Sequence, residues 1–141
     1  MTDKTIDEPH TPARQDWAGR GLSVLRIVTG LIFLSHGIVK LFGFPAGAQP
    51  GQMPLFGLMG FAGALELLGG LLVMIGLFTR PVAFVLSGEM AVAYFMAHAP
   101  QNLFPALNGG EPAILFCFIF LCLSATGAGS WSIDAVYARR A

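Results

Sequence analysis

Three basic residues, Arg26, His36 and Lys40, lie inside one apolar stretch, from Leu22 to Gly43. The stretch is long enough to cross a bilayer, because about 20 residues at about 1.5 Å per residue span the roughly 30 Å hydrocarbon core. A basic residue at membrane depth costs about 2.5–3.5 kcal/mol on insertion scales, and such residues usually face a bundle interior or a water-filled cavity. At about 100° per residue, Lys40 lies about 40° and His36 about 80° from Arg26. We therefore expect one shared polar face.

Two carboxyl residues, Glu66 and Glu89, interrupt two further apolar stretches, 57–78 and 81–98. Counted from the outer end of each stretch, Glu66 is about 13 Å deep and Glu89 about 15 Å deep. The basic face of the first stretch reaches a similar depth. Opposite charges at one depth neutralise each other, because an isolated charge in hydrocarbon is very costly. The sequence predicts that the carboxylates pair with Lys40, His36 or Arg26 and leaves the pairing open.

These residues predict a polar pocket that opens toward the outer side of the membrane. In such a pocket His36, Glu66 and Glu89 are the candidate catalytic residues, since they can exchange protons. The candidate substrate-binding residues are Arg26, Lys40 and His98. A second interpretation is that these groups only hold the helices together, with Lys40 and Arg26 extending to the two membrane surfaces. Metal ligation is disfavoured, because no compact His-x-x-x-His or Glu-x-x-His spacing is present.

Composition defines the class of protein that must position these residues. Of 141 residues, 55% are hydrophobic and 11% charged, against roughly 25% charged in an ordinary soluble domain. The chain is therefore expected to be an integral membrane protein with one domain. Its net charge of zero gives no argument for a nucleic-acid partner. Cys117 and Cys122 are five residues apart in an apolar run, so on a helix they face different directions and cannot pair.

The hydropathy pattern predicts an all-α membrane protein, an up-down bundle of four transmembrane helices over residues 21–134. The fourth span is expected from Ala113 to Gly127. Residues 1–20 are polar and are expected to form a disordered cytoplasmic tail, and residues 135–141 a short cytoplasmic C-terminal tail. All six Lys and Arg residues outside the first span fall on one side of this topology: Lys4, Arg14, Arg20, Arg80, Arg139 and Arg140. The positive-inside rule then places both termini in the cytoplasm. The expected location is the cell inner membrane, which the chain crosses several times.

Short motifs along the chain resemble the DoxX family of small four-span membrane proteins. The resemblance covers about residues 22–134. It rests on motifs in a fixed order, which are Leu25-Arg26 with Gly30, His36-Gly37 with Lys40, Glu66 with Gly69-Gly70, the corner Gly76 to Arg80, His98, Gly110-Glu111, and Gly127-x-Gly129 leading to Ser132-x-Asp134. Members of this family are linked to quinone-dependent thiosulfate oxidation and to membrane complexes that handle thiol or oxidative stress. The resemblance implies a membrane protein associated with redox chemistry.

Two functional hypotheses follow. In the first, the protein is a quinone-linked oxidoreductase subunit or accessory protein, in which quinone is the cofactor and the predicted pocket binds its two oxygens. In the second, it is a non-catalytic membrane scaffold or a small-solute carrier. The partners expected are membrane lipid, quinone, and either other protein subunits or further copies of the chain.

Overall fold

The computed structural model describes residues 12–140, and every regular element in this part of the chain is helical. The long helices are α1 (Pro12–Phe42), α2 (Leu58–Ile75), α3 (Thr79–Ala93) and α5 (Glu111–Thr126). A five-residue π-helix, η1 (Tyr94–His98), continues α3, and α4 (Pro105–Asn108) and α6 (Ile133–Ala138) are short. The prediction of an all-helical membrane protein is confirmed.

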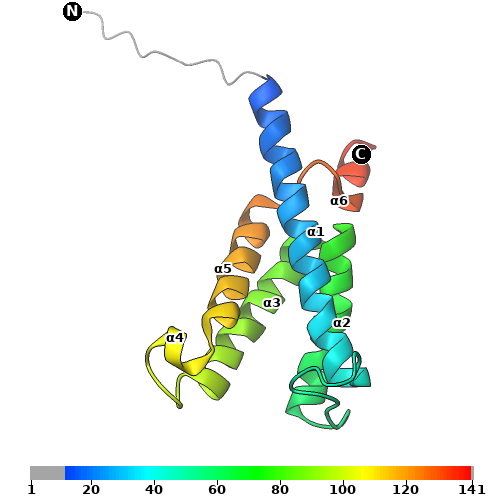
Figure 1. Ribbon diagram of the computed structural model, residues 1–141. Coiled ribbons are helices and arrows are strands. Elements are labelled where there is room, and N and C mark those ends of the chain that lie inside the picture. Colours follow the sequence, from blue (N-terminus) through cyan, green and yellow to red (C-terminus); the bar gives the residue numbers. More distant parts are fainter. Residues whose placement is uncertain (1–11, 141) are drawn as a thin grey trace, which may run out of the picture.

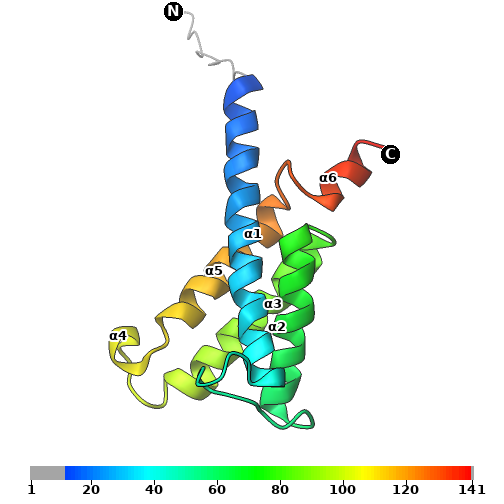
Figure 2. The same ribbon diagram turned by 45° about the vertical axis from the view of Figure 1, so that its right-hand side comes forward.

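The helices pack as two pairs. Helix α1 packs along α2, and α3 packs along α5, with fewer contacts between the pairs. The two pairs run apart toward the end of the molecule that carries α4 (Figure 1). The start of α1 and the C-terminal α6 lie together at the opposite end, where α1 projects beyond the other helices (Figure 2).

Close approach of α1 and α2 depends on glycine. A Cβ atom at Gly30 would lie 2.6 Å from the backbone nitrogen of Met74, and one at Gly70 would lie 2.6 Å from that of Leu34. Both distances are far below van der Waals contact, so only glycine permits this spacing. Small residues at helix contacts are the usual basis of packing between membrane helices, where lipid removes the hydrophobic driving force.

The core lies where the two pairs meet. Its centre is formed by Phe33, Val73, Leu86, Phe120 and Leu123, all almost completely buried. The rings of Phe33 and Phe120 meet edge to face with centroids 4.8 Å apart, a favourable geometry for aromatic pairs. The outer faces of the helices are apolar, as expected for surfaces in contact with lipid.

Among residues 12–140, three helical segments are long and apolar enough to cross a membrane: 17–42, 58–75 and 79–98. The segment predicted as the fourth span is α5, which has 16 residues and is about 24 Å long at 1.5 Å per residue. It is apolar but shorter than the roughly 30 Å core. The protein is therefore a membrane protein with several apolar helices.

The ends of two helices differ from the prediction. Helix α1 begins at Pro12, so residues 12–20 are helical where a disordered tail was expected; the rest of that tail, 1–11, lies outside the described residues. Helix α2 ends at Ile75, not at the Thr79 corner, because Gly76 adopts a left-handed conformation with φ 71° and caps the helix. The Thr79-Arg80-Pro81 corner instead begins α3.

Candidate functional site

A buried ion pair joins α1 to α2. The Lys40 Nζ atom lies 2.5 Å from Glu66 Oε1, and the two side chains are 13% and 3% exposed. This pair is one of those that the sequence left open, so the structure decides the partner of Lys40. The second carboxylate oxygen, Glu66 Oε2, is buried and accepts no hydrogen bond from any described residue.

Glycine residues bring the two helices close enough for this pair. A Cβ atom at Gly37 would lie 2.5 Å from the Leu67 nitrogen, and one at Gly63 would lie 2.9 Å from the Lys40 Cβ atom. Gly37 and Gly63 are one turn from the two charged residues, on the packed face. The small residues and the charges therefore form one unit, in which tight backbone packing excludes solvent from the ion pair.

A second carboxyl group approaches from α3. Both oxygens of Glu89 are buried and have no hydrogen-bond partner among the described residues. Glu89 lies within electrostatic range of both Glu66 and Lys40. Nearly all buried polar atoms in proteins are hydrogen-bonded, so three unpartnered carboxyl oxygens on two residues within electrostatic range of each other form an unusual group. We call Lys40, Glu66 and Glu89 the carboxylate cluster.

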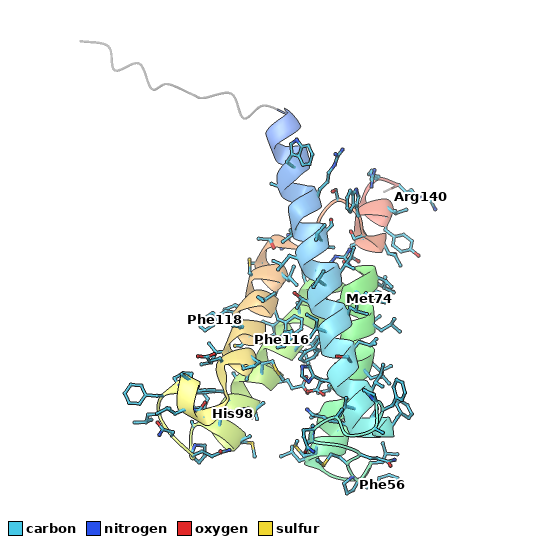
Figure 3. The ribbon with its side chains drawn as sticks, in the orientation of Figure 1. Phe56, Met74, His98, Phe116, Phe118 and Arg140 are labelled. Atoms are coloured by element: carbon cyan, nitrogen blue, oxygen red, sulfur yellow. The ribbon has the colours of Figure 1, made fainter. Side chains whose placement is uncertain are left out.

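His36 lies at the edge of this cluster. It is one turn before Lys40 on α1, its side chain is exposed, and it is within electrostatic range of Glu66. Its ring meets Phe116 of α5 edge to face, with centroids 6.0 Å apart. Figure 3 shows Phe116 pointing from α5 toward α1, whereas Phe118 points away. An imidazole and an aromatic ring thus border the carboxylate cluster on its accessible side.

The structure separates Arg26 from the cluster. Arg26 is ten residues before His36, which is about 15 Å along the helix, and is 0% exposed. Its guanidinium donates hydrogen bonds to the carbonyl oxygens of Val73, Met74, Ala128 and Trp131. Arg26 therefore ties α1 to the end of α2 and to the segment after α5, and is not part of the predicted pocket.

Asp134 was not predicted as a site residue. Together with Arg26 it forms a second polar group, which is separate from the carboxylate cluster. Its carboxylate accepts hydrogen bonds from the backbone nitrogens of Phe78 and Thr79, both at 2.9 Å, so it caps the start of α3. Ser132 caps α6 in the same turn by accepting from the Ala135 nitrogen. The signal in the sequence was the Ser132-x-Asp134 motif, a typical capping pattern.

His98 is also apart from the cluster. It is nine residues after Glu89, at the end of η1, and its Nδ1 atom lies 2.9 Å from the Asn108 carbonyl oxygen. Its ring stacks on Tyr94. The Asn108 side chain in turn donates to the Asn102 carbonyl and accepts from the Gly110 nitrogen. His98, labelled in Figure 3, therefore belongs to a hydrogen-bond network that orders the α3–α5 connection.

Of the six residues predicted to line one pocket, the structure brings four together: His36, Lys40, Glu66 and Glu89. Within residues 12–140 no three His, Cys, Asp or Glu side chains gather as metal ligands would. The cluster combines one cation with unpartnered carboxyl oxygens and a nearby imidazole. This set can bind a small polar group by hydrogen bonds and can exchange protons with it.

These features define a helical membrane protein whose first three long helices share a buried charged cluster. The chain belongs to the DoxX family, whose model matches residues 21–99. No solved structure matches the chain.

Three curated relatives resemble the chain over most of their length. An uncharacterized protein of Haemophilus influenzae is 40% identical, with 80% of this chain and 87% of the relative covered. CatD of Bacillus subtilis, whose name marks it as a candidate oxidoreductase, is 30% identical, with 81% and 84% covered. The inner membrane protein YqjF of Escherichia coli is 31% identical, with 81% and 89% covered.

Proposed function

We propose that this protein is an inner-membrane subunit or accessory protein of a quinone-linked oxidoreductase, and that the carboxylate cluster binds the quinone headgroup. The observation that carries the proposal is the set of three buried, unpartnered carboxyl oxygens, Glu66 Oε2 and both oxygens of Glu89. A buried acceptor without a partner loses about 1–3 kcal/mol of solvation. A ligand that supplies hydroxyl donors would restore those hydrogen bonds.

A quinol suits the chemistry of the cluster. Its two hydroxyl groups can donate to the carboxyl oxygens of Glu66 and Glu89, and the Lys40 ammonium can donate to the oxygen of the oxidised ring. Phe116 offers an aromatic face beside His36. When a quinol is oxidised to a quinone, it loses two protons and two electrons. The carboxylates and His36 take the protons toward the accessible edge, and the electrons pass to a redox centre on a partner subunit.

The proposed topology has four spans, with α5 as the fourth and both termini in the cytoplasm. The start of α1 and the end of the chain lie at one end of the molecule (Figure 1), as an even number of crossings requires. Four arginine residues lie at this end of the molecule or in the connection between helices there: Arg20, Arg80, Arg139 and Arg140. Their position agrees with the positive-inside rule. The likeness to an Escherichia coli inner membrane protein supports the same membrane. Fusion of a periplasm-active reporter after Ala141 should give no activity; high activity would exclude this topology.

Binding can be measured with purified full-length protein and a short-chain ubiquinol kept in its reduced form, because only the reduced ring carries the hydroxyl donors. We expect Glu66→Gln and Glu89→Gln each to weaken binding about tenfold, since a lost charge-assisted hydrogen bond is worth about 1.5 kcal/mol. Glu111→Gln is the matched control, because Glu111 is an exposed carboxylate at the start of α5 and its neutralisation should leave binding unchanged. If Glu66→Gln and Glu89→Gln both bind with the same affinity as the wild-type protein, the carboxylate cluster is not the quinone site.

The second hypothesis predicts a different result. A non-catalytic scaffold should co-purify from mild detergent with a stoichiometric soluble partner and should show no response to quinone. A small-solute carrier should instead move its solute across the membrane of reconstituted vesicles. Neither outcome requires the carboxylate cluster to bind a quinone, so either one can be distinguished from the proposed quinone site.

A further inference from the structure

A shallow, open cavity lies at the end of the molecule where α1 starts and α6 lies. It has a volume of about 400 Å³ and lies between the first part of α1 and α6. Its walls are formed by Arg20, Ser130, Trp131, Ala135, Ala138 and Arg139. Arg20 is twenty residues before Lys40 on the same helix, which is about 30 Å. The cavity is therefore separate from the carboxylate cluster.

Two guanidinium groups from distant parts of the chain face this cavity. Arg139 is oriented by its own neighbourhood, since Nε donates to the Ala135 carbonyl at 3.1 Å and Nη2 to the Ser130 carbonyl at 3.4 Å. An arginine side chain has five N–H donors, so donors remain for an anion. No acidic residue is among the six that form the walls. Asp134 is close in sequence, but both its oxygens are bonded at the start of α3.

Tryptophan side chains place the cavity at the membrane surface. The Arg20 guanidinium carbon lies 5.4 Å from the centroid of the Trp17 ring. Trp17 is 71% exposed and Trp131 is 55% exposed, and Trp17 lies five residues before the apolar stretch that begins at Leu22. Tryptophan is enriched at the level of lipid headgroups, where its ring is partly in hydrocarbon and its N–H group in water.

We propose that this cavity binds the phosphate headgroup of an anionic phospholipid from the adjacent leaflet. Arginine binds phosphate through paired N–H donors that match the spacing of its oxygens, and a cavity of about 400 Å³ is in the range that holds a small ligand group. The acyl chains would extend along the apolar outer face of α1. One bound lipid would then connect α1 to α6 across the cavity.

Native mass spectrometry of the full-length protein in detergent tests this site. Phosphatidylglycerol and phosphatidylcholine with identical acyl chains are added separately, and we expect bound phosphatidylglycerol to be preferred. Arg20→Gln and Arg139→Gln should each lower phosphatidylglycerol affinity about fivefold, the effect of one basic group at an anionic surface. Arg80→Gln is the matched control, because Arg80 is an exposed arginine at the start of α3 outside the cavity.

Three outcomes would overturn the proposal. Equal binding of the two lipids by the wild-type protein would show no recognition of charge, and an equal loss in Arg80→Gln would show only a general effect of net charge. Displacement of phosphatidylglycerol by millimolar inorganic phosphate would identify a site for a free anion in place of a lipid. Circular dichroism of each variant confirms that the helices are retained. Arg139→Lys keeps the charge without the paired donors, so it should bind with intermediate affinity.

Discussion

Replacement of Arg26 by methionine tests the role that the structure gives to this residue. Methionine keeps most of the length and apolar volume of the side chain but removes all its donors. The substitution would leave four carbonyl oxygens, those of Val73, Met74, Ala128 and Trp131, without the hydrogen bonds they now accept. These carbonyls belong to the end of α2 and to the segment between α5 and α6.

The expected loss of stability can be estimated from these bonds. At about 1 kcal/mol of net stability for each hydrogen bond, loss of all four costs about 4 kcal/mol. Removal of the buried charge itself offsets part of this, because its desolvation is costly. We therefore expect the free energy of unfolding to fall by about 2–4 kcal/mol. Arg26→Lys keeps the charge but has a single donor group, so it should lose about half as much.

The measurement is unfolding of the purified protein in mixed detergent micelles with increasing sodium dodecyl sulfate, followed by circular dichroism. Arg80→Met is the matched control, because Arg80 is exposed and its only described hydrogen bond, to Thr126, is 3.5 Å long. It should change the free energy of unfolding by less than about 0.5 kcal/mol. If Arg26→Met is as stable as this control, Arg26 is not a structural link and its assignment to a ligand pocket should be reconsidered.

Three further changes test the packing with the same unfolding assay. Gly30→Ala should lower the free energy of unfolding by about 1–3 kcal/mol, because its Cβ atom would overlap the backbone of α2. Gly88 faces open space, so Gly88→Ala should leave the free energy of unfolding unchanged. Equal effects of the two substitutions would contradict the close approach of α1 and α2. Asp134→Asn should lose about 0.5–2 kcal/mol as the charged cap of α3 is neutralised, and no loss would mean that the cap is dispensable. Phe120→Ala should lose about 3–5 kcal/mol by opening a cavity in the core, with the exposed Phe118→Ala as control; similar losses would place the core elsewhere.

Much of the carboxylate cluster could be predicted from the sequence, because depth in a membrane follows from residue number. Glu66, Glu89, His36 and Lys40 were placed at similar depths by counting 1.5 Å per residue, and the structure brings them together. The pairing could not be predicted, since it depends on how each helix is rotated about its axis. That rotation is set by the glycine contacts between α1 and α2, which no single helix reveals.

Arg26 shows where counting around one helix fails. Viewed along the helix axis, Arg26 lies on the same face as Lys40. This view does not show how far apart the two residues are along the axis. Arg26 instead contacts the end of α2 and the segment after α5. That segment is more than a hundred residues away from Arg26 in sequence. The end of α2 was placed three residues too late, because the apolar pattern continues through Leu77 and Phe78 although the helix is capped at Gly76.

The two polar groups inside this protein differ in one respect that bears on function. The Arg26 guanidinium and the Asp134 carboxylate are hydrogen-bonded to backbone groups of this chain, and beside them the hydroxyl oxygen of Thr79 is the one buried side-chain oxygen without a described partner. In the carboxylate cluster, Glu66 Oε2 and both oxygens of Glu89 have no described partner. The charged groups of Arg26 and Asp134 are thus satisfied within the chain, whereas the unpartnered atoms of the carboxylate cluster belong to its charged groups. The carboxylate cluster, bordered by an exposed imidazole, is therefore the group that we propose binds a partner from outside the chain.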